Sequence, residues 1–115
     1  MNCRRGDIVL VLFPDSNLRT AKRRPALVVQ ADESASELAQ TIVAMITSNM
    51  TRAGHPSRVT VRINDQSAAM SGLLMDSVIM TDNLATVRYS EIDRVLGVFS
   101  RMTEVNGALR TSLGL

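Results

Sequence analysis

The hydrophobic positions of this chain gather in short runs separated by polar stretches, a pattern typical of a β-rich protein. The first run, residues 8–13, is continuous, so both of its faces are expected to be covered. The run over residues 58–63 alternates instead, which predicts a half-exposed strand near an edge of the sheet. Strands are predicted over residues 8–13, 25–31, 41–47, 58–63, 73–80, 85–89 and 95–99.

Helical spacing of apolar residues is found at the end of the chain, where it predicts a helix over residues 101–113. The repeat is formed by Met102, Val105, Leu109 and Leu113. Ser100 is placed to cap the start of this helix, and Gly114 is placed to end it. Core packing is the simplest interpretation of the apolar stripe, and a partner-binding surface is the alternative. Single helical turns are expected within residues 32–40 and 89–93.

Five to seven short strands followed by one helix predict a mainly β fold. We expect a compact, mostly antiparallel β-barrel with a C-terminal α-helix and short connecting helices. The length of 115 residues fits a single domain over residues 1–115 with one core. The longest apolar run is far too short to cross a bilayer, so no membrane association and no signal peptide are expected. The single cysteine, Cys3, forms no disulfide framework within the chain, and a reducing cytoplasm is the expected location.

The distribution of charge is more informative than the net charge of +2. Residues 1–31 carry six cations and two acids, residues 32–57 carry one cation and three acids, and the remainder is balanced. A basic surplus confined to the first hairpin is the kind of localised patch that nucleic-acid binding needs. The chain has one tyrosine, two phenylalanines and no tryptophan, which disfavours a protein that grips bases mainly by aromatic stacking.

Several familiar chemical sites are missing from the sequence. It contains no CxxC or HExxH motif and no glycine-rich phosphate loop. His55 is the only histidine and is expected to be an exposed loop residue. Asp76 and Asp82 are six positions apart on one predicted stretch, roughly 20 Å at the rise of a strand, so they do not form a metal site together. We therefore expect neither a metal nor another cofactor.

The segment Lys-Arg-Arg-Pro at residues 22–25 is the strongest candidate for chemistry. Pro25 suits the first residue of a strand, so Arg24 is expected at the strand mouth. Thr47 ends a predicted strand, and antiparallel pairing of these two strands brings both residues to one end of the sheet. An arginine fork beside a hydroxyl is suited to a phosphodiester. A solvated basic loop and a hydroxyl that bonds a local turn are the structural alternatives.

Neighbouring polar residues extend this candidate site. Lys22 and Arg23 precede the arginine, and Ser48 and Asn49 follow the threonine. Their charges and small polar side chains make them candidates for substrate binding.

Six blocks of the sequence resemble the PemK/MazF family of toxin endoribonucleases. The blocks are R-G-D-I-V-L-V, R-P-A-L-V-V, M-I-T-S-N, D-S-V-I-M, G-V-F-S and the closing S-L-G-L. Each block alone is weak, but together they cover nearly the whole chain in the order and spacing of the family.

The resemblance implies a small Src-homology-3-like barrel of the PemK/CcdB type that forms a homodimer. It implies a toxin that cleaves single-stranded RNA at specific sequences without a metal, through attack of the substrate's own 2′-hydroxyl and a 2′,3′-cyclic phosphate. It also implies a cognate antitoxin, through which operator DNA could be bound. The catalytic arginine and threonine of the family fall on Arg24 and Thr47, and an acidic residue that some members use falls on Asp82.

The chain departs from the family pattern in two places. The family's G-x-E-Q-G loop is replaced by residues 15–22, and an arginine common in the family is replaced by Ala85. Two other functions therefore stay open at this point. One is a non-catalytic toxin or binding module on the same barrel, resembling a relative that poisons DNA gyrase through its C-terminal helix. The other is an inactivated relative that survives as an antitoxin-bound co-repressor.

Overall fold

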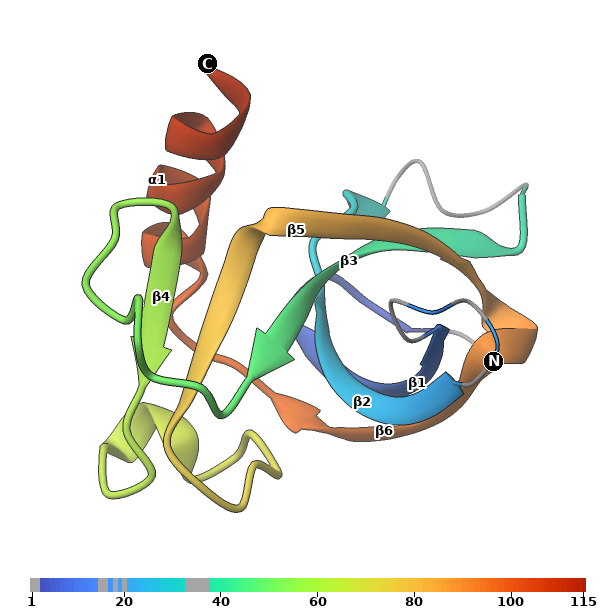
Figure 1. Cartoon of the computed structure of the whole chain (residues 1–115), viewed down its shortest axis with the longest axis horizontal. Helices are drawn as coiled ribbons and strands as arrows, with labels where there is room; N and C mark the ends of the chain where they lie inside the picture. Colours follow the sequence, from blue (N-terminus) through green and yellow to red (C-terminus); the bar gives the residue numbers. More distant parts are fainter. Residues whose placement is uncertain (1–2, 15–16, 18, 20, 33–37) are drawn as a thin grey trace.

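The fold is a six-stranded antiparallel sheet that curls into a barrel, with a helix at the C-terminal end (Figure 1). The computed structural model describes residues 3–14, 17, 19, 21–32 and 38–115. The strands are β1 (Asp7–Pro14), β2 (Ala21–Val28), β3 (Gln40–Thr47), β4 (Arg58–Val61), β5 (Ser77–Arg88) and β6 (Ile92–Val98). Their order in the sheet is β4-β5-β3-β2-β1-β6. The predicted mainly β architecture is confirmed.

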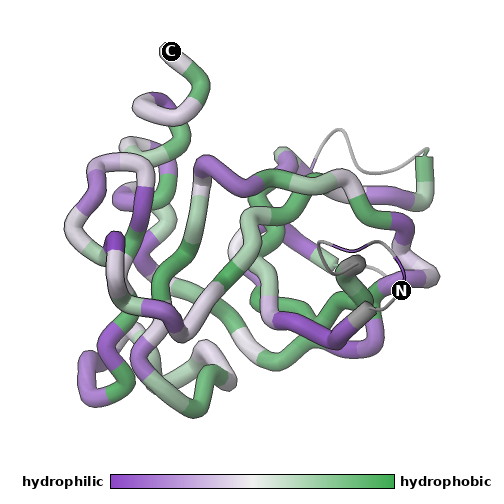
Figure 2. The backbone as a smooth tube through the Cα atoms, in the orientation of Figure 1, coloured by the Kyte–Doolittle hydropathy of each residue, from purple (hydrophilic) through white to green (hydrophobic). Residues whose placement is uncertain are grey.

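Both faces of the sheet are buried, because successive side chains of a strand point to opposite sides. The first group of buried side chains, here called the barrel cluster, includes Cys3, Val9, Val11, Ala26, Val28, Val43, Met45, Val87 and Ile92. The second, the helix cluster, includes Ile8, Leu27, Ala44, Ile46, Val59, Ile79, Phe99, Val105 and Ala108. Figure 2 shows hydrophobic colour running along the strands and hydrophilic colour at many of the turns. Coverage of both faces of β1 is confirmed over residues 8–11, whereas Leu12 is 49% exposed.

Strand β5 turns a sharp corner and serves both halves of the fold (Figure 1). Its first arm pairs with β4 and with the end of β3, and its second arm pairs with the start of β3. The pairing with β3 jumps from Met80 to Leu84, so three residues bulge out at the corner. Separate strands over residues 73–80 and 85–89 were therefore the wrong prediction, because the polar residues between them form a bulge within one strand.

The C-terminal helix α1 (Met102–Leu113) packs Val105 and Ala108 into the helix cluster. Gly114 ends the helix in the left-handed conformation at φ 70°, as predicted. Ser100 is not the cap, because Arg101 occupies the N-cap position and no side chain caps the helix. No helix in the described part of the chain is long and apolar enough to cross a membrane.

In the described part of the chain, the short 3-10 helices η2 (Gln66–Ala68) and η3 (Tyr89–Glu91) connect strands. The second confirms the helical turn expected within residues 89–93. The turn expected within residues 32–40 falls mostly on residues 33–37, which lie outside the described part of the chain.

Candidate functional site

The candidate site lies where strands β2 and β3 separate. These strands share three residue pairs, and the last of them joins Ala26 to Met45. The residue of β2 that precedes Ala26 is Pro25, which has no N–H to donate to β3. Beyond this point β2 continues to pair with β1, whereas β3 continues to pair with β5. The sheet is therefore split between the start of β2 and the end of β3.

Arg24 and Thr47 lie on the two sides of this split, each two residues beyond the pair of Ala26 and Met45. Extending the register of Ala26 with Met45 by two residues places Arg24 opposite Thr47. The structure thus brings the two predicted residues together, but not in the way the sequence indicated. Strand β2 begins at Ala21, so Arg24 lies within the strand rather than at its mouth. Pro25 interrupts pairing with β3 only, because β1 pairs with β2 throughout.

A cavity of about 520 Å³ opens at the split. The lining residues come from five strands, the turn after β3 and the segment before β5; they are Leu10, Arg23, Arg24, Pro25, Ile46, Thr47, Ser48, Gly72, Leu73, Leu74, Met75, Ser77, Arg94 and Leu96. Three of these residues are arginines and none is a carboxylate. The lining between the arginines is largely apolar, and the arginines make the cavity positively charged. The cavity is therefore suited to an anion that carries an uncharged flat or apolar group.

The hydroxyl of Thr47 accepts a hydrogen bond of 3.1 Å from the backbone N–H of Asn49. A hydroxyl also carries one proton of its own, which this bond leaves available to donate. Asn49 is held elsewhere, because its Oδ1 accepts bonds from the backbone N–H and the hydroxyl of Thr51. Thr47 and Ser48 therefore line the cavity, whereas Asn49 shapes the turn that positions the Thr47 hydroxyl.

The three predicted cations of β2 occupy different positions. Arg24 pairs with Val11 of the barrel cluster, and alternation along the strand places Arg23 on the other face. Arg23 lies 3.8 Å from Asp93 in an exposed ion pair, which contributes little stability. Lys22 pairs with Phe13 of β1 and does not line the cavity.

Asp82 lies apart from the cavity, at the corner of β5. Its carboxylate accepts two hydrogen bonds from Arg58 of β4, at 3.2 and 3.1 Å. Partial burial raises the pKa of Asp82, but the hydrogen bonds and charge of Arg58 outweigh it, and the pKa lies below its ordinary value. Asp82 is thus oriented toward β4 and not toward Thr47.

Asp76 has hydrogen-bond partners of its own, away from both Thr47 and Asp82. It accepts a 2.7 Å hydrogen bond from the backbone N–H of Ile63, which is the main cause of its lowered pKa, and a 3.3 Å bond from Arg62. The expected separation of Asp76 from Asp82 agrees with these different partners. Within the described residues, no group of three or more His, Cys, Asp or Glu side chains is arranged to hold a metal ion.

Sequence reasoning missed Arg94 and the wall formed by residues 72–75. Arg94 of β6 pairs with Leu10 of β1, which in turn pairs with Pro25 of β2. This row of three strands carries Arg94 into the cavity. The sequence offered no signal for it, because Arg94 lies 70 positions after Arg24 in a balanced stretch of charge.

The wall is held against β6 by a close contact between backbones. The N–H of Val98 donates a 2.7 Å hydrogen bond to the carbonyl of Met70. A Cβ on Gly97 would lie 2.2 Å from that same carbonyl oxygen, and a Cβ on Gly72 would lie 2.3 Å from the carbonyl oxygen of Leu96. Both positions therefore require glycine, and Gly72 also adopts φ +75°.

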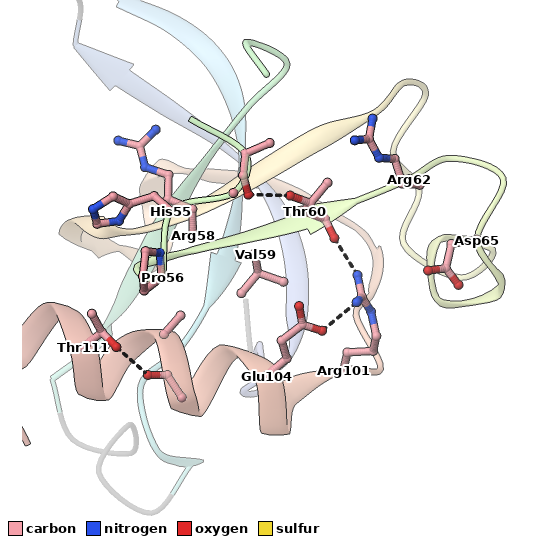
Figure 3. Close-up of a pocket in the computed structure, with 14 residues that line it drawn as sticks. His55, Pro56, Arg58, Val59, Thr60, Arg62, Asp65, Arg101, Glu104 and Thr111 are labelled. Carbon is pink, nitrogen blue, oxygen red and sulfur yellow. Dashed lines mark hydrogen bonds and ion pairs between the residues drawn. The ribbon is translucent and has the colours of Figure 1, made fainter. Parts of the chain in front are cut away.

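A larger hollow of about 870 Å³ lies elsewhere, between β4, the loop before it and α1 (Figure 3). Its arginines are all paired: Arg58 with Asp82, Arg62 with Asp76, and Arg101 with Glu104. Arg101 also donates 2.6 Å to the carbonyl of Thr60, so it ties α1 to β4 (Figure 3). With its cations neutralised, this hollow is a weaker candidate for an anionic ligand than the cavity at the split.

Comparison with known proteins gives consistent similarities. A family model described as "PemK-like, MazF-like toxin of type II toxin-antitoxin system" matches residues 4–113. The chain is 40% identical over 107 residues to endoribonuclease MazF6 of Mycobacterium tuberculosis, covering 90% of both chains. It is 31% identical over 115 residues to endoribonuclease MazF of Staphylococcus saprophyticus, covering 97% of this chain and 92% of that one.

The fold is also similar to that of solved structures. A mycobacterial endoribonuclease in complex with its cognate antitoxin superposes with a TM-score of 0.75 at 24% identity, over 99% of this chain and 97% of that one. This similarity supports the barrel with its C-terminal helix.

Proposed function

This chain belongs to the family of PemK-like, MazF-like toxins of type II toxin–antitoxin systems, and we propose that it is an endoribonuclease that cleaves single-stranded RNA at specific sequences. The observation that carries this proposal is the placement of Arg24 opposite Thr47 beside a cavity lined by three arginines and no carboxylate. Relatives at 40% and 31% identity bear the name endoribonuclease. In this proposal residues 1–115 act as one toxin domain in the cytoplasm.

The proposed reaction is an internal phosphoryl transfer that needs no metal ion. The 2′-oxygen of the RNA attacks the adjacent phosphorus and loses its proton. The bond from phosphorus to the 5′-oxygen of the next nucleotide breaks, and that oxygen gains a proton. The products are a 2′,3′-cyclic phosphate and a 5′-hydroxyl end.

Arg24 and Thr47 have distinct roles in this reaction. The planar guanidinium of Arg24 donates to the non-bridging phosphate oxygens, where negative charge grows in the transition state. The Thr47 hydroxyl, positioned by the N–H of Asn49, donates a hydrogen bond to the same phosphate and keeps its proton. Arg23 and Ser48 line the cavity and are assigned to substrate binding. Lys22, Asn49 and Asp82 lie outside it, so we assign them to RNA contacts beyond the reacting phosphate or to support of the loop.

A cleavage assay with two matched RNAs tests this function. A short RNA and the same RNA with a 2′-deoxy nucleotide at the cut are incubated with the protein in EDTA. We expect the first RNA to yield cyclic-phosphate and 5′-hydroxyl ends and the second to bind without being cut. Loss of cleavage in EDTA, or cleavage of the deoxy substrate, contradicts the proposed chemistry.

A cognate antitoxin is the second proposed partner. We propose that it presents an acidic, partly disordered segment that folds onto the basic region around Lys22, Arg23 and Arg24 and blocks RNA. The mycobacterial structural neighbour, described as in complex with its cognate antitoxin, supports this proposal. Operator DNA is expected to be bound only through the antitoxin.

The two other functions are less favoured. A gyrase-type poison would use α1 and leave Arg24 and Thr47 without a role, whereas an inactivated relative would not need to keep them together. The endoribonuclease names of the relatives also favour the catalytic function.

A further inference from the structure

We propose that the cavity at the split is a nucleotide subsite, in which Arg94 binds a phosphate next to the scissile one and residues 73–75 cover the attached base. This proposal rests on the proposed endoribonuclease function and names how the same site holds its substrate. It assigns Arg94 as a positioning residue and Leu74 as a contact to the base.

The state of Arg94 is the first observation that supports the subsite. Its side chain is exposed and lines the cavity. Within the described residues it forms no hydrogen bond or ion pair, whereas the three arginines of the larger hollow are each paired with a carboxylate. An unpaired guanidinium has donors available for a phosphate, and binding does not require an existing ion pair to break.

The position of Arg94 relative to Arg24 is the second observation. Arg94, Leu10 and Pro25 form one cross-strand row, so the backbones of Arg94 and Pro25 lie two strand spacings apart, about 10 Å. Arg24 precedes Pro25 and lies opposite Thr47. Arg94 therefore lies across the cavity from Arg24 and Thr47, a placement that suits a second phosphate of the same RNA strand.

The apolar walls of the cavity supply the third observation. Leu10, Leu73 and Leu96 lie between the cationic edges, and Leu74 and Met75 are 92% and 56% exposed. A nucleotide is an anion that carries a flat, weakly polar base, so its two parts match these two kinds of surface. The cavity volume of about 520 Å³ falls within the range of sites that take small organic molecules. The exposed leucine is explained if a base covers it.

The phosphate contact is tested with Arg94→Ala and the control Arg110→Ala. Arg110 is an exposed arginine of α1 that lines neither hollow, so both variants lose one positive charge. Binding of an RNA with a 2′-deoxy nucleotide at the cut is measured across salt concentrations. We expect Arg94→Ala to weaken binding by about tenfold or more and to reduce the salt slope by about 0.7, with Arg94→Lys intermediate. Equal curves for the two alanine variants overturn the proposal.

Kinetics separate positioning from chemistry. Arg94→Ala should raise KM and leave kcat within about twofold at saturating RNA, because the contact is the same in the ground state and the transition state. A fall in kcat with unchanged KM places Arg94 on the reacting phosphate and overturns its assignment to a neighbouring one. Melting curves that match wild type show that the fold is intact. If Arg94→Ala melts at a lower temperature than wild type, the binding curves of Arg94→Lys decide whether Arg94 contacts a phosphate.

The base contact is tested with Leu74→Ala, which removes an exposed side chain. We expect weaker RNA binding with an unchanged salt slope. The variant is also measured with RNAs that carry an abasic nucleotide next to the cut, on one side or the other. On the side whose base Leu74 contacts, the abasic site should weaken binding of wild type but not weaken binding of Leu74→Ala any further. If the losses from Leu74→Ala and from the abasic nucleotide add up on both sides of the cut, Leu74 contacts neither neighbouring base. If Leu74→Ala or Arg94→Ala instead shifts the sedimentation coefficient, the surface joins two copies of the chain and the subsite is wrong.

The outcomes also distinguish this proposal from the function on which it rests. If wild type cuts RNA and the variants behave as the control, only the subsite fails. If wild type binds but never cuts RNA, while Arg94→Ala still differs from Arg110→Ala, only the endoribonuclease function fails.

Discussion

Arg24 of β2 and Thr47 of β3 line the same cavity, each two residues beyond the last pair that their strands share, Ala26 with Met45. Pro25 ends the pairing one residue earlier, and each strand is then held by its other neighbour, β1 or β5. The pair of Arg24 and Thr47 is therefore supported by rigid strands on both sides and is open in the middle, where a phosphate can enter between the two side chains.

Replacement of Arg24 tests its role at the scissile phosphate. Arg24→Ala should reduce cleavage on the order of 10²–10³-fold, because it removes a preorganised donor to the developing charge. Arg24→Lys should recover little, since an ammonium lacks the planar fork. Cleavage rates and melting curves are measured together. A variant that melts as wild type and cuts at the wild-type rate shows that the site has been misplaced.

Thr47 gives a second, chemically distinct test. Thr47→Ala should lower kcat on the order of 10²-fold, whereas Thr47→Ser keeps the hydroxyl that accepts the Asn49 N–H and should retain most activity. The rates are compared at saturating RNA. Equal loss in the serine and alanine variants would mean that the methyl group, and not the hydroxyl, is what the site needs.

The ion pair of Asp82 and Arg58 predicts how stability depends on acid. The folded chain holds the pKa of Asp82 below its ordinary value, so the unfolded chain takes up the proton first and stability is lost as the pH falls. Asp82→Asn and Arg58→Gln should each flatten the decline in melting temperature below about pH 5. The double variant should add nothing to either single one. An unchanged decline in both single variants contradicts the coupling.

Assembly is expected to be a two-fold symmetric dimer. A barrel of this size has a small core, and Leu113 at the end of α1 and Leu115 just beyond it are 54% and 85% exposed. Leu113→Glu should therefore shift the protein toward monomer in sedimentation at micromolar concentration. The matched control is Ile63→Glu, which alters an exposed residue beyond the end of β4. Wild type that sediments only as a monomer refutes the dimer.

The antitoxin is expected to compete with RNA for the basic region of β2. Charge reversal by Lys22→Glu should weaken binding of an acidic antitoxin segment and should lower the salt dependence of that binding. Competition between the segment and a labelled RNA gives the measurement. Simultaneous binding of both, with cleavage unchanged, would show that inhibition does not act by blocking this surface.

The sequence predicted the type of each element better than its role in the sheet. Pro25 was predicted to begin a strand, but β2 begins at Ala21, because the proline ends pairing with β3 while pairing with β1 continues. The sequence alone does not say which neighbouring strand loses its hydrogen bond. The bulge between Met80 and Leu84 depends on β4 pairing with one arm of β5, which is a long-range effect. For the same reason the resemblance located Arg24 and Thr47, whereas Arg94 emerged only from the register of β6 on β1.

The close contact of Gly72 and Gly97 divides the cavity wall into a part that cannot vary and a part that can. A side chain at either glycine would collide with backbone atoms, whereas Leu74 and Met75 contribute little to the core and tolerate replacement. A combinatorial library that randomises residues 74 and 75 and retains both glycines and Leu73, which packs against the helix cluster, should therefore yield folded proteins with altered nucleotide preference. The same division offers evolution a route to new cleavage motifs, since the wall can diversify while the proposed catalytic residues, Arg24 and Thr47, stay unchanged.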